Sequence, residues 1–254
     1  MNIKIKFKGK SIRICLRRHS DFSAFYQVVV ENSYPNILKS ISNEDIVIDA
    51  GANIGVFTLL ASQVAKNVIA IEPDEENLKI LELNLNMNKI TNVILIKKAL
   101  YYHSNEILSF KSDGVMSAFS SNGDKRVETI TLDDIIEESN LEPKSLILKM
   151  DIEGAEKYAF KSMEKTTKVL KFFEAEIHDE ECEEVMRKYL GNQFIFHEEK
   201  AQSMKNVYEF ALKHPLKTFK LEYSNKFRTA RRLLKARERN YQGKYPKIVF
   251  AEKQ

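Results

Sequence analysis

The chain has 254 residues, of which 43% are hydrophobic and 30% are charged, which suits one sizeable α/β core but is too short for two large domains. Its two cysteines, Cys15 and Cys182, stand far apart in the sequence and exclude a disulfide framework or a Cys-x-x-Cys metal site. Because no apolar run approaches the roughly 18 residues needed to span a bilayer, we expect a soluble, cytoplasmic protein.

Residues 1–40 are predicted to form a strand and helix cap on the main sheet. Residues 1–18 alternate between polar and apolar side chains, as two short strands joined at Lys8-Gly9-Lys10 would. This alternation differs from the apolar run of a signal peptide. Residues 22–32 have a helical pattern, and the main domain is then expected over residues 41–254.

An apolar strand at residues 46–50, a helical pattern at 56–65 and a second apolar strand ending in Glu72 predict a βαβ unit. Gly51 and Gly55 allow a sharp turn and let a cofactor approach the backbone. Glu72 stands 21 residues after Gly51, close to the roughly 20 residues that separate a glycine turn from the acid that binds a ribose. The spacing predicts a cofactor that contains a nucleoside.

The residues of the glycine turn favour one class of cofactor over another. A dinucleotide site requires G-x-G-x-x-G and a helix N-terminus that can receive a diphosphate. Here Asn53 replaces the middle glycine and the strand ends in Asp49, which would repel a diphosphate but could accept a hydrogen bond from an ammonium group. S-Adenosylmethionine carries such a group, so the turn favours methyl transfer over hydride transfer.

Apolar runs and helical patterns alternate along the rest of the chain, as in a parallel sheet with helices on both faces. Two short strands at residues 106–110 and 127–130 flank a polar loop, 111–126, which fits either a flap or an uninvolved surface hairpin. Core strands are predicted at 68–72, 93–97, 146–150, 169–177, 192–197 and 247–251, and helices at 75–87, 132–138, 153–163 and 180–190.

Three acids gather where the strand at residues 146–150 ends. Asp151 and Glu153 follow this strand, and ligands of open α/β sheets bind at the carboxyl ends of the strands. There the two carboxylates could orient a substrate hydroxyl, accept its proton or hold a divalent cation. Glu156 fits a supporting role at this site and a stabilising charge at a helix N-terminus equally well.

The next strand brings a histidine to the same edge of the sheet. Glu176 and His178 are two positions apart, so they share one face of the strand. An imidazole is well suited to taking a proton from an alcohol near neutral pH. We therefore predict Asp151, Glu153 and His178 as catalytic residues, with the participation of a metal left open.

Five short motifs occur in order along the chain: DAGANIG at 49–55, IEP at 71–73, TLDD at 131–134, KMDIEGAE at 149–156 and EIH at 176–178. Together with Arg18, Asp21 and Tyr34-Pro35, they resemble the signature of the FkbM-type methyltransferases, over about residues 20–200 and the last strand. The resemblance implies a class I methyltransferase (Rossmann-like) α/β fold, with a seven-stranded, mostly parallel sheet whose last strand is antiparallel. It also implies S-adenosylmethionine as donor and transfer to a hydroxyl oxygen.

The same resemblance implies roles for individual residues. The loop at 49–55, with Asp49, Gly51, Asn53 and Gly55, would hold the methionine end of the donor, and Glu72 its ribose. Asp151, Glu153 and His178 would face the acceptor. The third core strand is followed by Lys97-Lys98-Ala99-Leu100, which has no acid for the adenine amino group, so backbone groups near Ala99 are the expected contact.

Positive charge is concentrated at the end of the chain. The residues from Lys213 onward contain 13 Lys or Arg and 3 Asp or Glu, a net +10, whereas the rest of the chain carries −6. Residues 198–246 are predicted as a basic insertion with a helix at 226–239. As a lid over the acceptor site it would favour an anionic small molecule, sugar or glycan. A solvated helix packed on the body or on a second subunit fits equally well.

Two other partners and two other functions remain open. It is compatible with contact to a membrane surface and with an RNA acceptor. The chain lacks the Asn-Pro-Pro loop of amino-group methylation and a cysteine at a strand end for carbon methylation, so an RNA methyltransferase is the secondary hypothesis. The third is a non-catalytic module that binds the cofactor.

Overall fold

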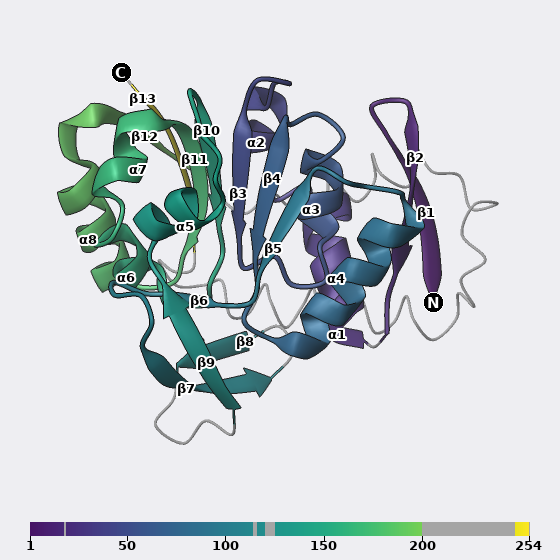
Figure 1. Cartoon of the computed structure of the whole chain (residues 1–254). Helices are drawn as coiled ribbons and strands as arrows, with labels where there is room; N and C mark the ends of the chain where they lie inside the picture. Colours follow the sequence, from purple (N-terminus) through teal and green to yellow (C-terminus); the bar gives the residue numbers. More distant parts are fainter. Residues whose placement is uncertain (18, 114–115, 120–124, 200–246, 254) are drawn as a thin grey trace.

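A seven-stranded sheet forms the centre of the computed structural model, which describes residues 1–253 except 18, 114–115, 120–124 and 200–246 (Figure 1). The strand order is β12-β13-β11-β10-β3-β4-β5. β13 is antiparallel to both of its neighbours, and the other adjacent pairs are parallel. The predicted fold is confirmed. The strands are β3 (Ile46–Ala50), β4 (Asn67–Ile71), β5 (Val93–Ile96), β10 (Leu146–Met150), β11 (Leu170–Ile177), β12 (Phe194–Glu199) and β13 (Lys247–Lys253).

Helices cover both faces of this sheet because successive side chains of each buried strand point to opposite faces. Val47 of β3 packs in a hydrophobic cluster with α3 and α4, whereas Ile46 and Ile48 pack in a second cluster with α5, α6 and α8. Figure 1 shows these two groups of helices on either side of the sheet. The helices are α3 (Val56–Ala61), α4 (Glu75–Met87), α5 (Leu132–Glu138), α6 (Glu156–Phe160), α7 (Glu164–Val169) and α8 (Glu180–Leu190).

Two helices are shorter than predicted, and the second difference lies beside the candidate site. The helix expected at 56–65 ends at Ala61. The helix expected at 153–163 begins only at Glu156, because Glu153 and Gly154 have φ angles of 54° and 93°, which a right-handed helix excludes. Glu153 therefore belongs to a turn between β10 and α6.

The N-terminal segment forms a hairpin and three short helices. β1 (Asn2–Phe7) pairs with β2 (Lys10–Cys15), and α1 (His19–Phe25) continues into the π-helix η1 (Tyr26–Val30) before α2 (Pro35–Ser40). The single helix predicted at 22–32 is thus divided into two types of helix. The apolar side chains of this segment join the core of the main domain.

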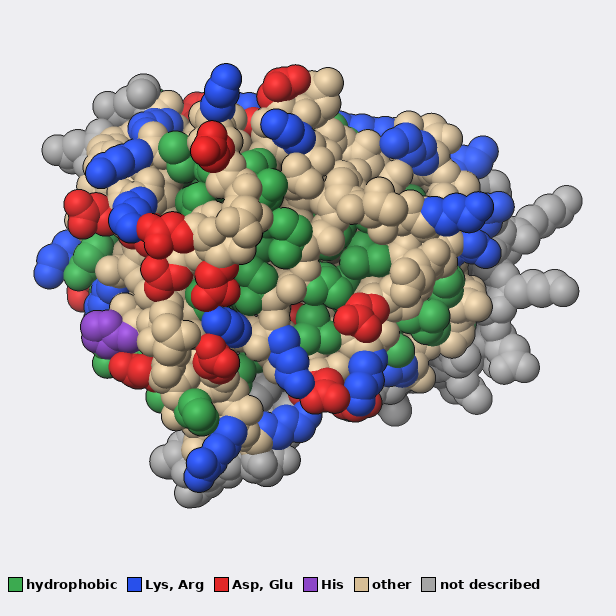
Figure 2. Space-filling view, viewed as in Figure 1, with side chains coloured by type: hydrophobic (Ala, Val, Ile, Leu, Met, Phe, Trp, Pro, Cys, Tyr) green, Lys and Arg blue, Asp and Glu red, His purple; other side chains and the backbone are tan. Residues whose placement is uncertain are grey.

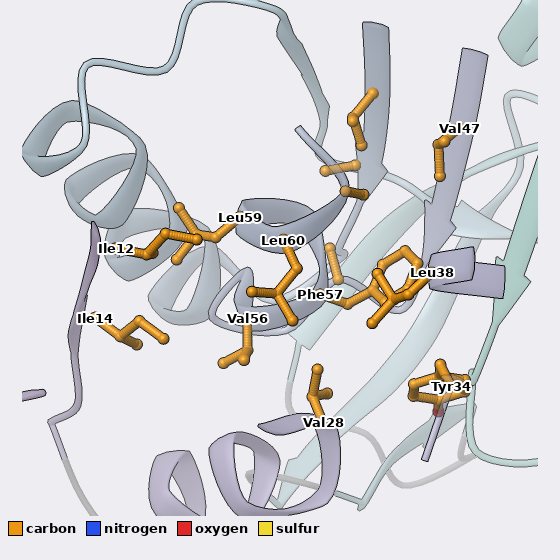
Figure 3. Packing of buried hydrophobic residues seen from close by; sticks show 14 of the residues in the cluster. Ile12, Ile14, Val28, Tyr34, Leu38, Val47, Val56, Phe57, Leu59 and Leu60 are labelled. Atoms are coloured by element: carbon orange, nitrogen blue, oxygen red, sulfur yellow. The ribbon is translucent and has the colours of Figure 1, made fainter. Parts of the chain in front are cut away.

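Figure 3 shows this packing from close by. Ile12 and Ile14 of β2 lie in one hydrophobic cluster with Leu59 and Leu60 of α3. The alternate positions of the hairpin are exposed and basic, and Figure 2 shows Lys and Arg side chains at the right-hand edge, where Figure 1 places β1 and β2. The alternation predicted from the sequence therefore separates a core face from a cationic face.

A second, four-stranded sheet follows β5, in the order β6-β9-β7-β8. Its strands are β6 (Ala99–Leu100), β7 (Ile107–Asp113), β8 (Met116–Phe119) and β9 (Lys125–Ile130). The two predicted short strands are present, but the expected polar loop at 111–126 is wrong in part. Residues 110–113 pair in antiparallel fashion with 116–119, so a strand occupies the middle of that loop.

The strand predicted at 192–197 is β12, which extends to Glu199. Residues 200–246 of the predicted basic insertion lie outside the described residues, as does the helix predicted at 226–239. Among the helices that the structure describes, none combines the length and apolar character needed to cross a membrane.

Candidate functional site

A pocket opens at the carboxyl ends of β3, β4 and β10, where the sequence predicts a ligand. Its empty volume is about 970 Å³ with open solvent included. Six predicted site residues line it: Gly51, Asn53, Glu72, Ala99, Asp151 and Glu153. Asp49, Gly55 and His178 are not among its lining residues, and their contacts explain why.

The glycine turn has the predicted shape but for a different reason. Gly51 and Gly55 have φ angles of 75° and 84°, which glycine adopts without strain. A Cβ atom on Gly51 would lie 1.9 Å from the carbonyl oxygen of Asp151, and one on Gly55 would lie 2.7 Å from Cγ of Leu81. Contacts within the protein therefore already require both glycines, whether or not a cofactor approaches them.

Glu72 lies at the end of β4, on the pocket wall. Its Oε2 accepts a hydrogen bond from the Asn53 amide at 2.8 Å, and its Oε1 accepts one from the Asp74 amide at 2.9 Å. Burial raises its pKa to about 7 in spite of these hydrogen bonds. Oε1 also accepts a hydrogen bond from Nδ2 of Asn77 at 3.3 Å. Glu72 is therefore held in place, and Oε2, which accepts from the Asn53 amide, can accept a second hydrogen bond from a ligand.

Asp49 is fully buried and does not line the pocket, but it contacts Lys149, which does. Its Oδ2 accepts a hydrogen bond from Thr58 at 2.5 Å, and its Oδ1 lies 3.1 Å from Nζ of Lys149. Lys149 also donates to the carbonyl oxygens of Gly51 at 2.9 Å and Ala50 at 3.3 Å. Burial acts to lower the pKa of Lys149, but the nearby carboxylates of Asp49 and Asp151 outweigh it and raise the pKa.

Lys149 is a functional candidate that the sequence analysis missed. It lines the pocket and holds the glycine turn through the carbonyl oxygens of Ala50 and Gly51. It also stands directly opposite Asp49 in the pairing of β10 with β3. The available signal was a charged residue in an otherwise apolar strand, since a buried lysine needs an acidic partner. The chain positions of Lys149 and Asp49 alone could not identify that pair.

The structure brings the three predicted catalytic residues together. One ligand atom from each of Asp151, Glu153 and His178 lies within 4.8 Å of the other two. Nε2 of His178 is 3.4 Å from Oε2 of Glu153, and Nδ1 is 3.0 Å from Oε1 of Glu156. Two carboxylates and an imidazole are also a donor set that divalent cations accept.

Glu156 supports this arrangement through hydrogen bonds to the turn and to the histidine. It is fully buried, and its Oε1 accepts hydrogen bonds from the amides of Ile152 at 3.1 Å and Gly154 at 3.2 Å. The same oxygen contacts His178. Glu156 therefore fixes both the turn that carries Glu153 and the orientation of the histidine ring, which favours the supporting role over a simple helix charge.

The surroundings of His178 change its expected protonation. Burial acts to lower its pKa, but the hydrogen bonds to Glu153 and Glu156 outweigh burial and raise it to about 11. The ring is then an imidazolium at neutral pH, unlike the neutral base predicted from the sequence. Burial also raises the pKa of Glu153, against the hydrogen bond from His178, which makes the carboxylate side of the site a better proton acceptor.

A family model and a curated relative both indicate a methyltransferase. A family model described as "Methyltransferase FkbM domain" matches residues 49–231. The hexuronic acid methyltransferase AglP of Haloferax volcanii is 30% identical over 146 residues, which are 56% of this chain and 59% of that protein. The matched part thus spans less than two thirds of this relative.

Two solved structures are more distant. The methyltransferase FkbM from Methylobacillus flagellatus is 16% identical, with a TM-score of 0.49, covering 69% of this chain and 45% of that one. M. jannaschii TYW2 in complex with AdoMet is 16% identical, with a TM-score of 0.44, covering 99% of this chain and 85% of that one. Neither similarity contributes to the assignment.

The family match includes the glycine turn, Glu72 and the acidic cluster, and the order of the seven strands agrees with the fold that the motifs imply. The predicted family and the predicted class of enzyme, a methyltransferase, are confirmed, and the family supports S-adenosylmethionine as donor. The chain belongs to the methyltransferase FkbM domain family.

Proposed function

We propose that this chain is an S-adenosylmethionine-dependent O-methyltransferase whose acceptor is a hydroxyl of a sugar or glycan. The carrying observation is one pocket that is lined both by the glycine turn with Glu72 and by Asp151 and Glu153. The first acceptor class to test is a hexuronic acid, because the relative AglP is named for such an acceptor and the basic C-terminal segment suits an anionic acceptor.

The charges of the pocket fit this donor. Among its lining residues, Glu72, Asp151 and Glu153 are acidic, and Lys98 and Lys149 are basic. Lys98 is engaged outside the pocket by Glu128 and Glu138, and Lys149 is paired with Asp49. The remaining carboxylates attract a cationic ligand and repel a diphosphate. S-Adenosylmethionine supplies an electrophilic methyl group on a sulfonium sulfur.

The donor is expected to be held by three parts of the wall. Glu72 would accept the ribose hydroxyls, the turn at Gly51 and Asn53 would contact the methionine end, and the backbone at Ala99 would contact the adenine. Lys149 supports the turn through the carbonyl oxygens of Ala50 and Gly51. All four residues expected to hold the donor line the pocket, which supports the proposed roles.

The chain's part in the reaction is to take one proton. As the C–S bond breaks and the new C–O bond forms, the hydroxyl proton of the acceptor passes to the neighbouring carboxylates, Asp151 and Glu153. Burial raises the pKa of Glu153, and the charge of Asp151 raises it further. His178, as an imidazolium, holds Glu153 and balances part of the negative charge.

Calorimetry with S-adenosylhomocysteine tests the donor site without any acceptor. We expect binding to wild type and a loss of at least tenfold in Glu72→Gln, because one oxygen of the ribose acceptor is replaced by an amide. Glu82→Gln, on the exposed face of α4, is the matched control. No heat of binding with wild type would overturn the donor assignment.

The acceptor class needs a second assay. Methyl-labelled S-adenosylmethionine is offered with glucuronic and galacturonic acids, with the corresponding neutral hexoses, and with a structured RNA. We expect an O-methylated uronic acid, identified by a mass increase of one methylene group. Methylation of the RNA alone would replace the proposed acceptor class. The absence of product with every sugar and with the RNA would contradict it.

A further inference from the structure

A tyrosine from the N-terminal segment reaches the acceptor end of the pocket. Tyr34 precedes residue 49, where the family match begins, yet its Oη donates a hydrogen bond to Oδ2 of Asp151 at 2.8 Å. The tyrosine is 1% exposed and lines the pocket. The two residues lie 117 positions apart, so this contact depends on how the N-terminal segment packs.

We propose that Tyr34 is a positioning residue that fixes the carboxylate of Asp151 for the acceptor hydroxyl. The proposal rests on the proposed function. Tyr34 engages Oδ2 and leaves Oδ1 for the acceptor, so it determines the direction from which a hydroxyl can be bound. Charge-assisted O–H···O⁻ hydrogen bonds are short and directional, which suits this task.

The ring of Tyr34 is held on two sides. It packs edge-on against Phe57 of α3, with centroids 5.8 Å apart and an interplanar angle of 75°, and Figure 3 shows the two rings in the same cluster. Nζ of Lys149 lies 5.4 Å from the centroid, within the range of cation–π contacts. Pro35, the next residue, begins α2.

The hydroxyl keeps its proton and therefore acts as a donor. Burial raises the pKa of Tyr34 well above its ordinary value, and the nearby charge of Asp151 raises it further. Tyr34 is thus unsuited to be the proton acceptor. As a donor to Oδ2, the tyrosine orients the carboxylate of Asp151 for a hydrogen bond from the substrate.

The same segment reaches the end of the neighbouring strand. Nε2 of Gln27 donates to Oε2 of Glu176 on β11 at 2.9 Å, and Gln27 also lines the pocket. Two side chains of the N-terminal segment therefore meet acids at the ends of β10 and β11. This placement indicates that residues 19–40 complete the acceptor end rather than only covering the core.

A matched pair of tyrosines provides the test. Y34F removes the hydroxyl that reaches Asp151 but keeps the ring packing. Y26F is the control, because the Tyr26 hydroxyl is buried on the same segment and has no hydrogen-bond partner in the described part of the chain. Calorimetry with S-adenosylhomocysteine should give equal affinities for wild type and both variants.

The kinetics of methyl transfer to the uronic acid acceptor give the decisive readout. In Y34F we expect kcat to fall about tenfold with the KM for S-adenosylmethionine unchanged, because Asp151 loses the hydrogen bond that orients its carboxylate. Y26F should match wild type. An unchanged kcat in Y34F, or equal losses in both variants, would overturn the proposal.

A double-mutant cycle tests the contact without an acceptor. Y34F, D151A and the double variant are compared with wild type by urea unfolding. We expect Y34F to shift the folding equilibrium about tenfold toward the unfolded state in the wild-type background, and much less in the D151A background. Additive effects would overturn the proposal, whereas absent S-adenosylhomocysteine binding in wild type would overturn the proposed function instead.

Discussion

At the scale of single residues, the protonated state of His178 depends on two carboxylates. The hydrogen bonds to Glu153 and Glu156 outweigh burial and raise its pKa to about 11, whereas a histidine of the unfolded chain loses its proton near pH 6.5, about the ordinary value. A group whose pKa is higher in the folded protein than in the unfolded chain stabilises the fold. This stabilisation is complete at a pH below the pKa of the unfolded chain, and it is lost as the pH rises toward the pKa of the folded protein.

We therefore expect the free energy of unfolding to fall as the pH rises from about 6.5 toward 11. His178→Gln should flatten this fall and lower stability at pH 6 by about 2–3 kcal/mol. Urea unfolding at pH 6 and pH 9 measures both effects. His197→Gln, on the exposed side of β12, is the control, and equal pH slopes for wild type and His178→Gln would contradict the ion-paired arrangement.

The residue roles differ in how far the sequence could predict them. Asp151 and Glu153 follow an apolar strand directly, so their place at the pocket could be predicted from order alone. The protonation of His178 could not, because it depends on Glu156, which lies 22 positions away in the chain. Tyr34 and Lys149 belong to the motifs of the resemblance, but their partners, Asp151 and Asp49, come from distant segments and could not be predicted from the sequence.

At the scale of elements, the turn between β3 and α3 combines left-handed backbone with close packing. A Cβ atom on Gly51 would lie 1.9 Å from the carbonyl oxygen of Asp151, so the turn after β3 is pressed against the turn after β10. Gly9 has a similar φ of 80°, yet nothing lies within 4 Å of a Cβ atom there. The two glycines separate the effect of crowding from the effect of backbone strain.

Gly9→Ala should lower stability by about 1–2 kcal/mol, the strain of a left-handed residue. Gly51→Ala carries the same strain and must also move the chain at Asp151, so we expect a loss of more than about 3 kcal/mol or failure to fold. Thermal unfolding compares them. Similar melting temperatures for the two variants would show that the packing around Gly51 yields more easily than the distances indicate.

Element boundaries show where sequence patterns suffice. α4 was predicted with its full bounds because a helical pattern follows Asp74, whose side chain accepts hydrogen bonds from the amides of Glu76 and Asn77. β8 was missed because four residues in a polar stretch form a strand only by pairing with β7. α6 is short because its expected first turn has left-handed residues at Glu153 and Gly154.

At the scale of the whole molecule, the N-terminal hairpin and the main domain share one core. Ile14 of β2 is fully buried in the hydrophobic cluster that includes α3 and the strand side chain of Val47. A detachable cap would bury few side chains of the hairpin. Here the buried positions alternate with exposed basic ones along both strands, so the hairpin contributes to the stability of the domain that holds the pocket.

Ile14→Ala should therefore destabilise the entire chain, by about 2–5 kcal/mol, as expected for a large-to-small change in a core. Lys6→Ala, on the exposed face of the same hairpin, should change stability by less than about 0.5 kcal/mol. Because Tyr34 and Gln27 follow this hairpin in the chain, loosening it should also weaken the acceptor end of the pocket. Urea unfolding followed by two probes, fluorescence and circular dichroism, decides the matter. Coincident transitions that shift together in Ile14→Ala mean one cooperative unit, whereas an early transition confined to the N-terminal segment would mean that the cap folds separately from the methyltransferase sheet.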